Sequence, residues 1–102
     1  MNLDRLKILA EHFEELGDYA MAESITIQIL ALKQREYGPH APELLPEIYN
    51  LALLQEVQDD CDKALSNAQL AYAIARANRT ETSVDLFEIK GMLSRLTGPM
   101  VA

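Results

Sequence analysis

The stretch LGDYAMAE, residues 16–23, holds the signals that end one helix and begin another. Gly17 can take the left-handed backbone conformation that often follows a helix, and the Asp18 carboxylate can accept hydrogen bonds from the free N–H groups of a helix start. Ala22, one turn further on, is small enough to let two helices approach closely. The stretch therefore predicts the tight bend of a helical hairpin.

Apolar residues recur at spacings of three and four throughout the chain, as one face of an α-helix requires. With Asn2 as the first N-cap, this pattern predicts five helices, over residues 3–16, 18–36, 43–58, 61–78 and 83–96. The linker YGPHAP, residues 37–42, separates the second helix from the third because its glycine and two prolines interrupt helical structure. Asp60 is the predicted N-cap of the fourth helix, and Thr82 with Asp85 forms a weak capping box before the fifth. With no strand signal, the sequence predicts an all-α fold.

The chain resembles itself at an offset of 42 residues. Eight identities fall within residues 3–36 at this offset: Leu3, Leu9, Ala10, Glu14, Asp18, Ala22, Ser24 and Ala31 match Leu45, Leu51, Ala52, Glu56, Asp60, Ala64, Ser66 and Ala73. A second shift places Leu44, Leu51 and Leu54 on Leu86, Leu93 and Leu96. We therefore expect one domain over residues 1–102, made of a unit at about 2–42, a second at about 43–82, and a half unit or capping helix at about 83–97.

These residues resemble the tetratricopeptide repeat (TPR) family, whose unit follows the pattern W-x2-L-G-x2-Y…A-x3-F. The first copy has Leu6, Leu9, Ala10, Phe13, Ala22 and Thr26 at these places, the second has Ile48, Leu51, Ala52, Gln55, Ala64 and Ala68, and the poorer third has Lys90, Leu93, Ser94 and Thr97. The 42-residue unit, the linker GPHAP and the segment YNLALL are similar to the kinesin-light-chain subgroup. The resemblance covers residues 3 to about 97 and implies antiparallel hairpins stacked into a short right-handed superhelix of about five helices.

Composition limits the classes of partner and the location. The chain has 102 residues, 49% of them apolar, and a net charge of -7. Such a surface repels phosphate groups, so nucleic acid and anionic membranes are poor partners and a basic or neutral peptide is favoured, although acidity also serves solubility alone. The N-terminus lacks an apolar signal segment, no apolar run of membrane-spanning length occurs, and Cys61 is the single cysteine. We expect a cytoplasmic protein.

The residues that could carry chemistry form no known catalytic arrangement. His12 and His40 lie far apart in sequence, and His40 matches the linker histidine of the subgroup, which implies a structural hydrogen bond. Cys61 stands where the family usually places an aromatic residue, which implies a buried apolar role. The acidic run at residues 59–62 lacks the spacing of a calcium loop. The sequence therefore predicts no enzyme, no metal site and no cofactor.

The resemblance implies a concave groove lined by the first helix of each unit. Transferred position by position, this groove includes Asp4, Lys7, Glu11, Tyr49, Asn50, Leu53, Glu56, Glu88, Gly91 and Arg95. Asn50 falls where related arrays bind a peptide backbone, and Tyr49 with Leu53 forms an apolar surface beside it or packs against a neighbouring helix. The chaperone-binding branch clamps a carboxylate in this groove. Only Lys7 and Asn50 match that clamp, whereas Glu11, Glu88 and Met92 replace its other members, so a carboxylate ligand is disfavoured.

These inferences favour a non-catalytic adaptor or scaffold that binds a peptide or partner helix in the groove. A structural role is the first alternative, in which the incomplete third unit mediates homo-oligomerisation or joins a larger array. The second alternative is the ligand-sensing part of a larger regulator.

Overall fold

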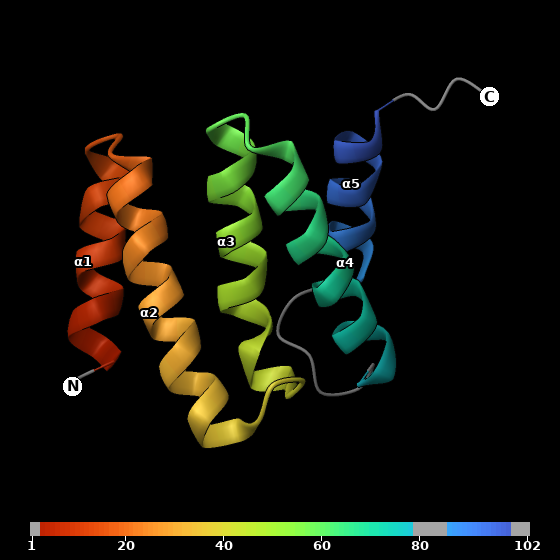
Figure 1. The fold of residues 1–102 in the computed structure, drawn as a ribbon, viewed down its shortest axis with the longest axis horizontal. Helices are drawn as coiled ribbons and strands as arrows, with labels where there is room; N and C mark the ends of the chain where they lie inside the picture. The colour runs from red at the N-terminus through yellow and green to blue at the C-terminus, as the bar shows by residue number, and fades with distance from the viewer. Residues whose placement is uncertain (1–2, 79–85, 99–102) are drawn as a thin grey trace.

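A computed structural model describes residues 3–78 and 86–98 of the chain. The helices are α1 (Leu3–Glu15), α2 (Tyr19–Tyr37), a single 3-10 turn η1 (Pro42–Leu44), α3 (Leu45–Val57), α4 (Cys61–Ala77) and α5 (Leu86–Thr97). They lie side by side in the order of the chain, and each α-helix packs against the next (Figure 1). The all-α prediction is confirmed.

The backbone repeats at the interval seen in the sequence. Helices α1 and α3 begin and end 42 residues apart, and α2 and α4 begin 42 residues apart. The two bends have the same pattern of backbone hydrogen bonds. In the first, the amides of Gly17 and Asp18 donate to the carbonyls of Glu14 and Phe13. In the second, the amides of Asp59 and Asp60 donate to the carbonyls of Glu56 and Gln55. Both hairpins therefore use the same turn, although their turn residues differ.

The predicted helix caps have different outcomes. Asp18 caps α2, because its Oδ1 accepts a hydrogen bond from the Met21 amide at 3.2 Å. Asp60 occupies the predicted N-cap position of α4, but its side chain makes no capping hydrogen bond, and its carboxylate instead lies 3.7 Å from the Lys63 ammonium. The proposed capping box of Thr82 and Asp85 lies outside the described residues.

The core runs between the hairpins, and small residues occupy its tightest points. Ala22, Ala52 and Ala64 are fully buried and Ala10 nearly so, which lets the helix backbones pack closely. The larger part of the core joins α2, η1, α3, α4 and α5 through Leu30, Leu44, Leu45, Ile48, Leu51, Ala71, Ile74, Ala75 and Ile89. A separate cluster of Leu6, Ala10, Ile25 and Ile29 holds α1 on α2.

Cys61 is exposed, so the predicted buried role is wrong. It is the first residue of α4, and Tyr19, at the matching first position of α2, is also exposed. Both side chains therefore face solvent at the first position after the bend. In the part of the chain that the structure describes, no helix combines the length and the apolar character needed to cross a membrane.

Candidate functional site

A pocket of about 150 Å³ lies between α1 and α3. Lys7, Ala10, Glu11 and Glu14 line it from α1, Glu47 and Asn50 from α3, and Thr26 and Ile29 from α2. Thr26 and Ile29 are buried and form its floor. The pocket brings together three residues that the sequence assigned to the groove, namely Lys7, Glu11 and Asn50. We call this pocket and its rim the α1–α3 groove.

Asn50 is the polar group best placed to bind a ligand in this groove. Its Nδ2 donates a long hydrogen bond of 3.5 Å to Glu14 Oε2, and the side chain is half-buried. No described residue donates a hydrogen bond to its amide oxygen. The side chain is therefore held weakly toward α1 while keeping an acceptor and a second N–H for a ligand.

One of the lining residues, Glu47, forms an ion pair with Lys33, which lies outside the pocket lining. Glu47 is nine-tenths buried, and its Oε1 has the Lys33 ammonium of α2 as its sole partner among the described residues. Lys33 also donates to the Glu43 carbonyl at 3.4 Å. Because Lys33 compensates Glu47, the remaining charges at the pocket are those of Lys7, Glu11 and Glu14. The pocket lining therefore carries one excess negative charge.

Sequence reasoning missed two of these acidic groups. Glu14 is not among the groove residues that the resemblance implies, although Lys7, Glu11 and Glu14 follow the spacing of one helix side. That spacing could have identified it. Nothing in the sequence indicates that Glu47 is buried, because its partner is supplied by another helix.

The other predicted groove residues lie between α3 and α5. Tyr49 and Leu53 are half-buried and pack beside Met92, Leu93 and Leu96 of α5. Met92 itself is fully buried and is not a groove residue, contrary to its place in the sequence comparison. Tyr49 and Leu53 therefore contribute both to packing against a neighbouring helix and to the surface beside Asn50, the two alternatives that the sequence left open.

Glu56 and Arg95 form a two-pronged ion pair beside Tyr49. Arg95 Nε and Nη2 each lie 3.0 Å from a Glu56 carboxylate oxygen, and this hydrogen bonding raises the pKa of Arg95. Burial raises the pKa of the Tyr49 hydroxyl, the Glu88 carboxylate raises it further, and Arg95 opposes both. Glu56 and Arg95 satisfy each other, so they offer less to a ligand than Glu11, Glu14 and Asn50.

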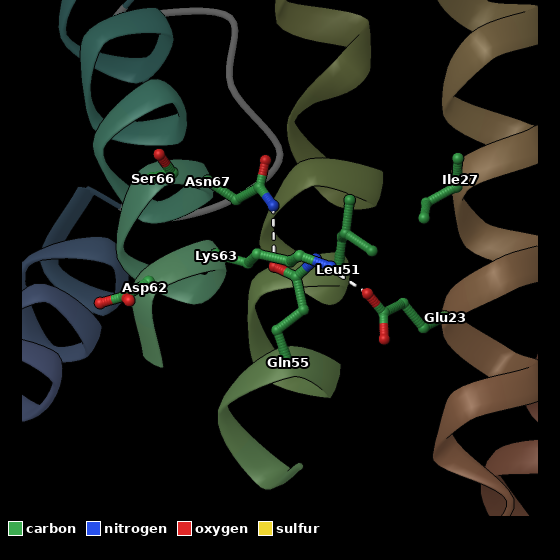
Figure 2. Close-up of a pocket in the computed structure, with 8 residues that line it drawn as sticks. All are labelled: Glu23, Ile27, Leu51, Gln55, Asp62, Lys63, Ser66 and Asn67. Carbon is green, nitrogen blue, oxygen red and sulfur yellow. Dashed lines mark hydrogen bonds between the residues drawn. The ribbon is translucent and has the colours of Figure 1, made fainter. Parts of the chain in front are cut away.

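A second depression, of about 520 Å³, lies between α2 and α4 with α3 beneath it. Its walls are second helices and its floor is a first helix, so it opens on the other side of the array from the α1–α3 groove. Figure 2 shows Gln55 between Glu23 and Asn67: its Nε2 donates to Glu23 at 3.0 Å, and its Oε1 accepts from Asn67 at 2.8 Å. Gln58 donates to the other Glu23 oxygen at 2.9 Å. The network ties α2, α3 and α4 together.

The remaining candidates for chemistry stand apart. His12 is exposed and contacts the Phe13 ring edge to face, with centroids 5.7 Å apart. His40 is exposed, and its predicted structural hydrogen bond is not found among residues 3–78 and 86–98. Within those same ranges, no three histidine, cysteine or acidic side chains are grouped as a metal site.

The comparisons with known proteins agree with this architecture. The family model for the tetratricopeptide repeat matches residues 4–87, which include both hairpins and reach the beginning of α5. No single curated protein matches the chain.

Proposed function

The chain belongs to the tetratricopeptide repeat family, whose members are typically non-catalytic and bind other proteins, and we propose that it is an adaptor whose α1–α3 groove binds an extended peptide segment of a partner. The observation that carries this proposal is the pocket between α1 and α3, which combines a half-buried amide with acidic side chains. A groove of this kind can bind a peptide backbone and one anchoring side chain.

The acidic side chains favour a partner with a lysine or arginine. Glu11 and Glu14 both line the pocket, and Lys7 is the sole basic residue among its lining groups. A ligand cation placed between the carboxylates replaces part of its lost hydration with charge-assisted hydrogen bonds. A ligand carboxylate meets repulsion there, which agrees with the mismatch to the carboxylate clamp.

Asn50 fixes the position of the peptide backbone. A side-chain amide both donates and accepts, so it can pair with the C=O and N–H of a single peptide residue. Tyr49, the preceding residue in the sequence, faces α5, so its surface extends the site toward that helix. We expect Asn50 to contribute more to affinity than Tyr49.

The experiment is a selection of displayed random peptides on the wild-type protein, followed by anisotropy measurements with the selected peptides. We expect them to carry a lysine or arginine. Asn50→Ala and Glu14→Gln should each weaken binding about fivefold, which corresponds to roughly 1 kcal/mol. Ser66→Ala, which alters an exposed residue of the α2–α4 depression, is the matched control and should bind as the wild type does.

Affinity should also fall as the salt concentration rises, because exposed charges are screened. Peptides that bind Asn50→Ala and Glu14→Gln as tightly as the wild type would show that the α1–α3 groove is not the site. A selection that enriches acidic peptides would contradict the proposed anchor.

A further inference from the structure

Helix α1 carries an apolar surface on the side that faces away from the rest of the array. It stands at the end of the row and packs against α2 (Figure 1). Arg5, Ile8, Leu9, His12 and Leu16 make up this surface, which we call the end face. Ile8 and Leu16 are each 65% exposed and Leu9 is 44% exposed. Apolar side chains this exposed, grouped on one helix side, are typical of an interaction surface.

The repeat shows how the same positions are used inside the array. The residues 42 positions after Leu9 and His12 are Leu51 and Leu54, and each is only 4% exposed. Leu51 belongs to the core cluster that includes Leu30 of α2. This side of a first helix is therefore covered by the preceding hairpin.

The same holds for α5. The residue 84 positions after Ile8 is Met92, which is fully buried in a cluster with Ala52 of α3 and Ala68 of α4. In α3 the residue that matches Ile8 is Asn50, which is half-buried and faces α1. Since the matching sides of α3 and α5 both lie against preceding helices, the geometry of the end face fits a helix.

The other end of the array is a poorer partner for the end face. Leu3, Leu6 and Ala10 of α1 pack against α2, and the matching residues of α5 are Phe87, Lys90 and Ser94, all exposed. Stacking copies head to tail would place the end face against this mixed surface, and a contact between two different surfaces continues into rings or chains of copies. A contact between two end faces brings apolar residues together from both copies and closes as a pair.

We propose that two copies of the chain associate through their end faces, with the two α1 helices antiparallel about a twofold axis. Arg5 and Glu15 lie near opposite ends of α1, about 15 Å apart along the helix, and both are exposed. The antiparallel arrangement brings Arg5 toward Glu15 of the partner subunit at both ends of the contact. A parallel arrangement would place like charges together. The interface is the same patch on both copies, as a closed dimer requires.

This contact leaves the α1–α3 groove open, because Lys7, Glu11 and Glu14 lie on another side of α1. The dimer would present two grooves and could bind a partner with two recognition segments more tightly than either groove alone. The inference does not depend on the proposed peptide binding, since it concerns a different surface.

Sedimentation equilibrium over a concentration series tests the proposal. The wild type should shift from 11.4 kDa toward twice that mass as concentration rises. Ile8→Glu and Leu9→Glu should each weaken association at least tenfold while leaving the circular dichroism spectrum unchanged, since both side chains are exposed. Val57→Glu is the matched control: Val57 is 58% exposed at the end of α3, and its replacement should leave the dimer intact.

A charge exchange tests the orientation. Arg5→Glu should weaken the dimer, and the double variant Arg5→Glu with Glu15→Arg should restore it. The proposal is overturned if the wild type stays at 11.4 kDa up to about 0.5 mM, because a dimer with a Kd of about 0.1 mM would be mostly associated at that concentration. The end face would then be a surface for a helix of another protein. A dimer that persists in Leu9→Glu, or that Val57→Glu also breaks, overturns it as well.

Discussion

Asp59 holds in the second bend the left-handed backbone conformation that Gly17 holds in the first, with φ of 62° and 79° respectively. A residue with a Cβ is strained in this conformation, although aspartate tolerates it better than most. We predict that Asp59→Gly raises the free energy of unfolding by about 0.5–1 kcal/mol and that Gly17→Asp lowers it by a similar amount.

Urea denaturation of both variants measures this effect. The two variants make opposite exchanges at matching positions of the repeat. They should therefore change the free energy of unfolding in opposite directions with unchanged m-values, so each variant is the control for the other. A destabilising Asp59→Gly would contradict the prediction. It would show that the Asp59 side chain makes a stabilising interaction larger than the backbone strain.

Gly91 lies within α5, and a methyl group at its Cα would meet no described atom within 4 Å apart from its chain neighbours and the backbone of its own helix. A glycine inside a helix can mark a close contact with a neighbouring segment, and the structure shows none at Gly91 among the described residues. We predict that Gly91→Ala stabilises the protein by about 1 kcal/mol, because alanine has the higher helix propensity. Thermal and urea unfolding would measure it, with Ser94→Ala, at an exposed position of α5, as a control of smaller effect.

Gln55 is buried and joins Glu23 to Asn67. We predict that Gln55→Glu lowers the free energy of unfolding by about 2 kcal/mol at neutral pH, because two carboxylates then face each other in a partly buried site. The loss should shrink at acidic pH, where the pair takes up a proton. The double variant Glu23→Gln with Gln55→Glu reverses the direction of the hydrogen bond and should recover most of the stability. A double variant no more stable than Gln55→Glu would contradict this account.

The parts of the fold that depend on local signals could be predicted from the sequence. Gly17 and Asp18 end and begin helices through their own backbone and side-chain geometry, and the structure agrees at both. Asp60 has the same identity at the matching position, yet its side chain turns to Lys63. The choice between a cap and an ion pair is made by a neighbour one turn away and is not visible in the repeat pattern.

The candidate site was only partly predictable, for a geometric reason. Tyr49 and Asn50 are adjacent, so their side chains point about 100° apart on the helix, one toward α5 and the other toward α1. The sequence treated them as one surface. The burial of Glu47 depends on Lys33, which lies on a different helix. It could therefore not be predicted from the sequence around Glu47 alone.

The Lys33–Glu47 ion pair joins α2 to α3, and both side chains are nearly inaccessible, at 13% and 11% exposed. We predict that Lys33→Met lowers the free energy of unfolding by about 2–3 kcal/mol, because it leaves a buried carboxylate without its cation. Adding Glu47→Leu should recover most of this loss, since position 89, which matches 47 in the repeat, is a buried isoleucine. Urea denaturation of the two single variants and the double variant gives the coupling, and additive losses would contradict it.

Tyr49 makes the stability of the α3–α5 contact sensitive to alkaline pH. Burial and the Glu88 carboxylate raise the pKa of its hydroxyl above the ordinary value of 10.0, so folding favours the neutral phenol. The stability that this preference contributes is present below pH 10 and is lost as the pH rises through the raised pKa. Subtracting the phenolate absorbance of Tyr49→Phe from that of the wild type should isolate a titration with its midpoint above 10. Glu88→Gln should lower this midpoint, and Arg95→Gln should raise it, because the guanidinium stabilises the phenolate. A midpoint that does not move in either variant would show that Tyr49 is electrostatically isolated from α5.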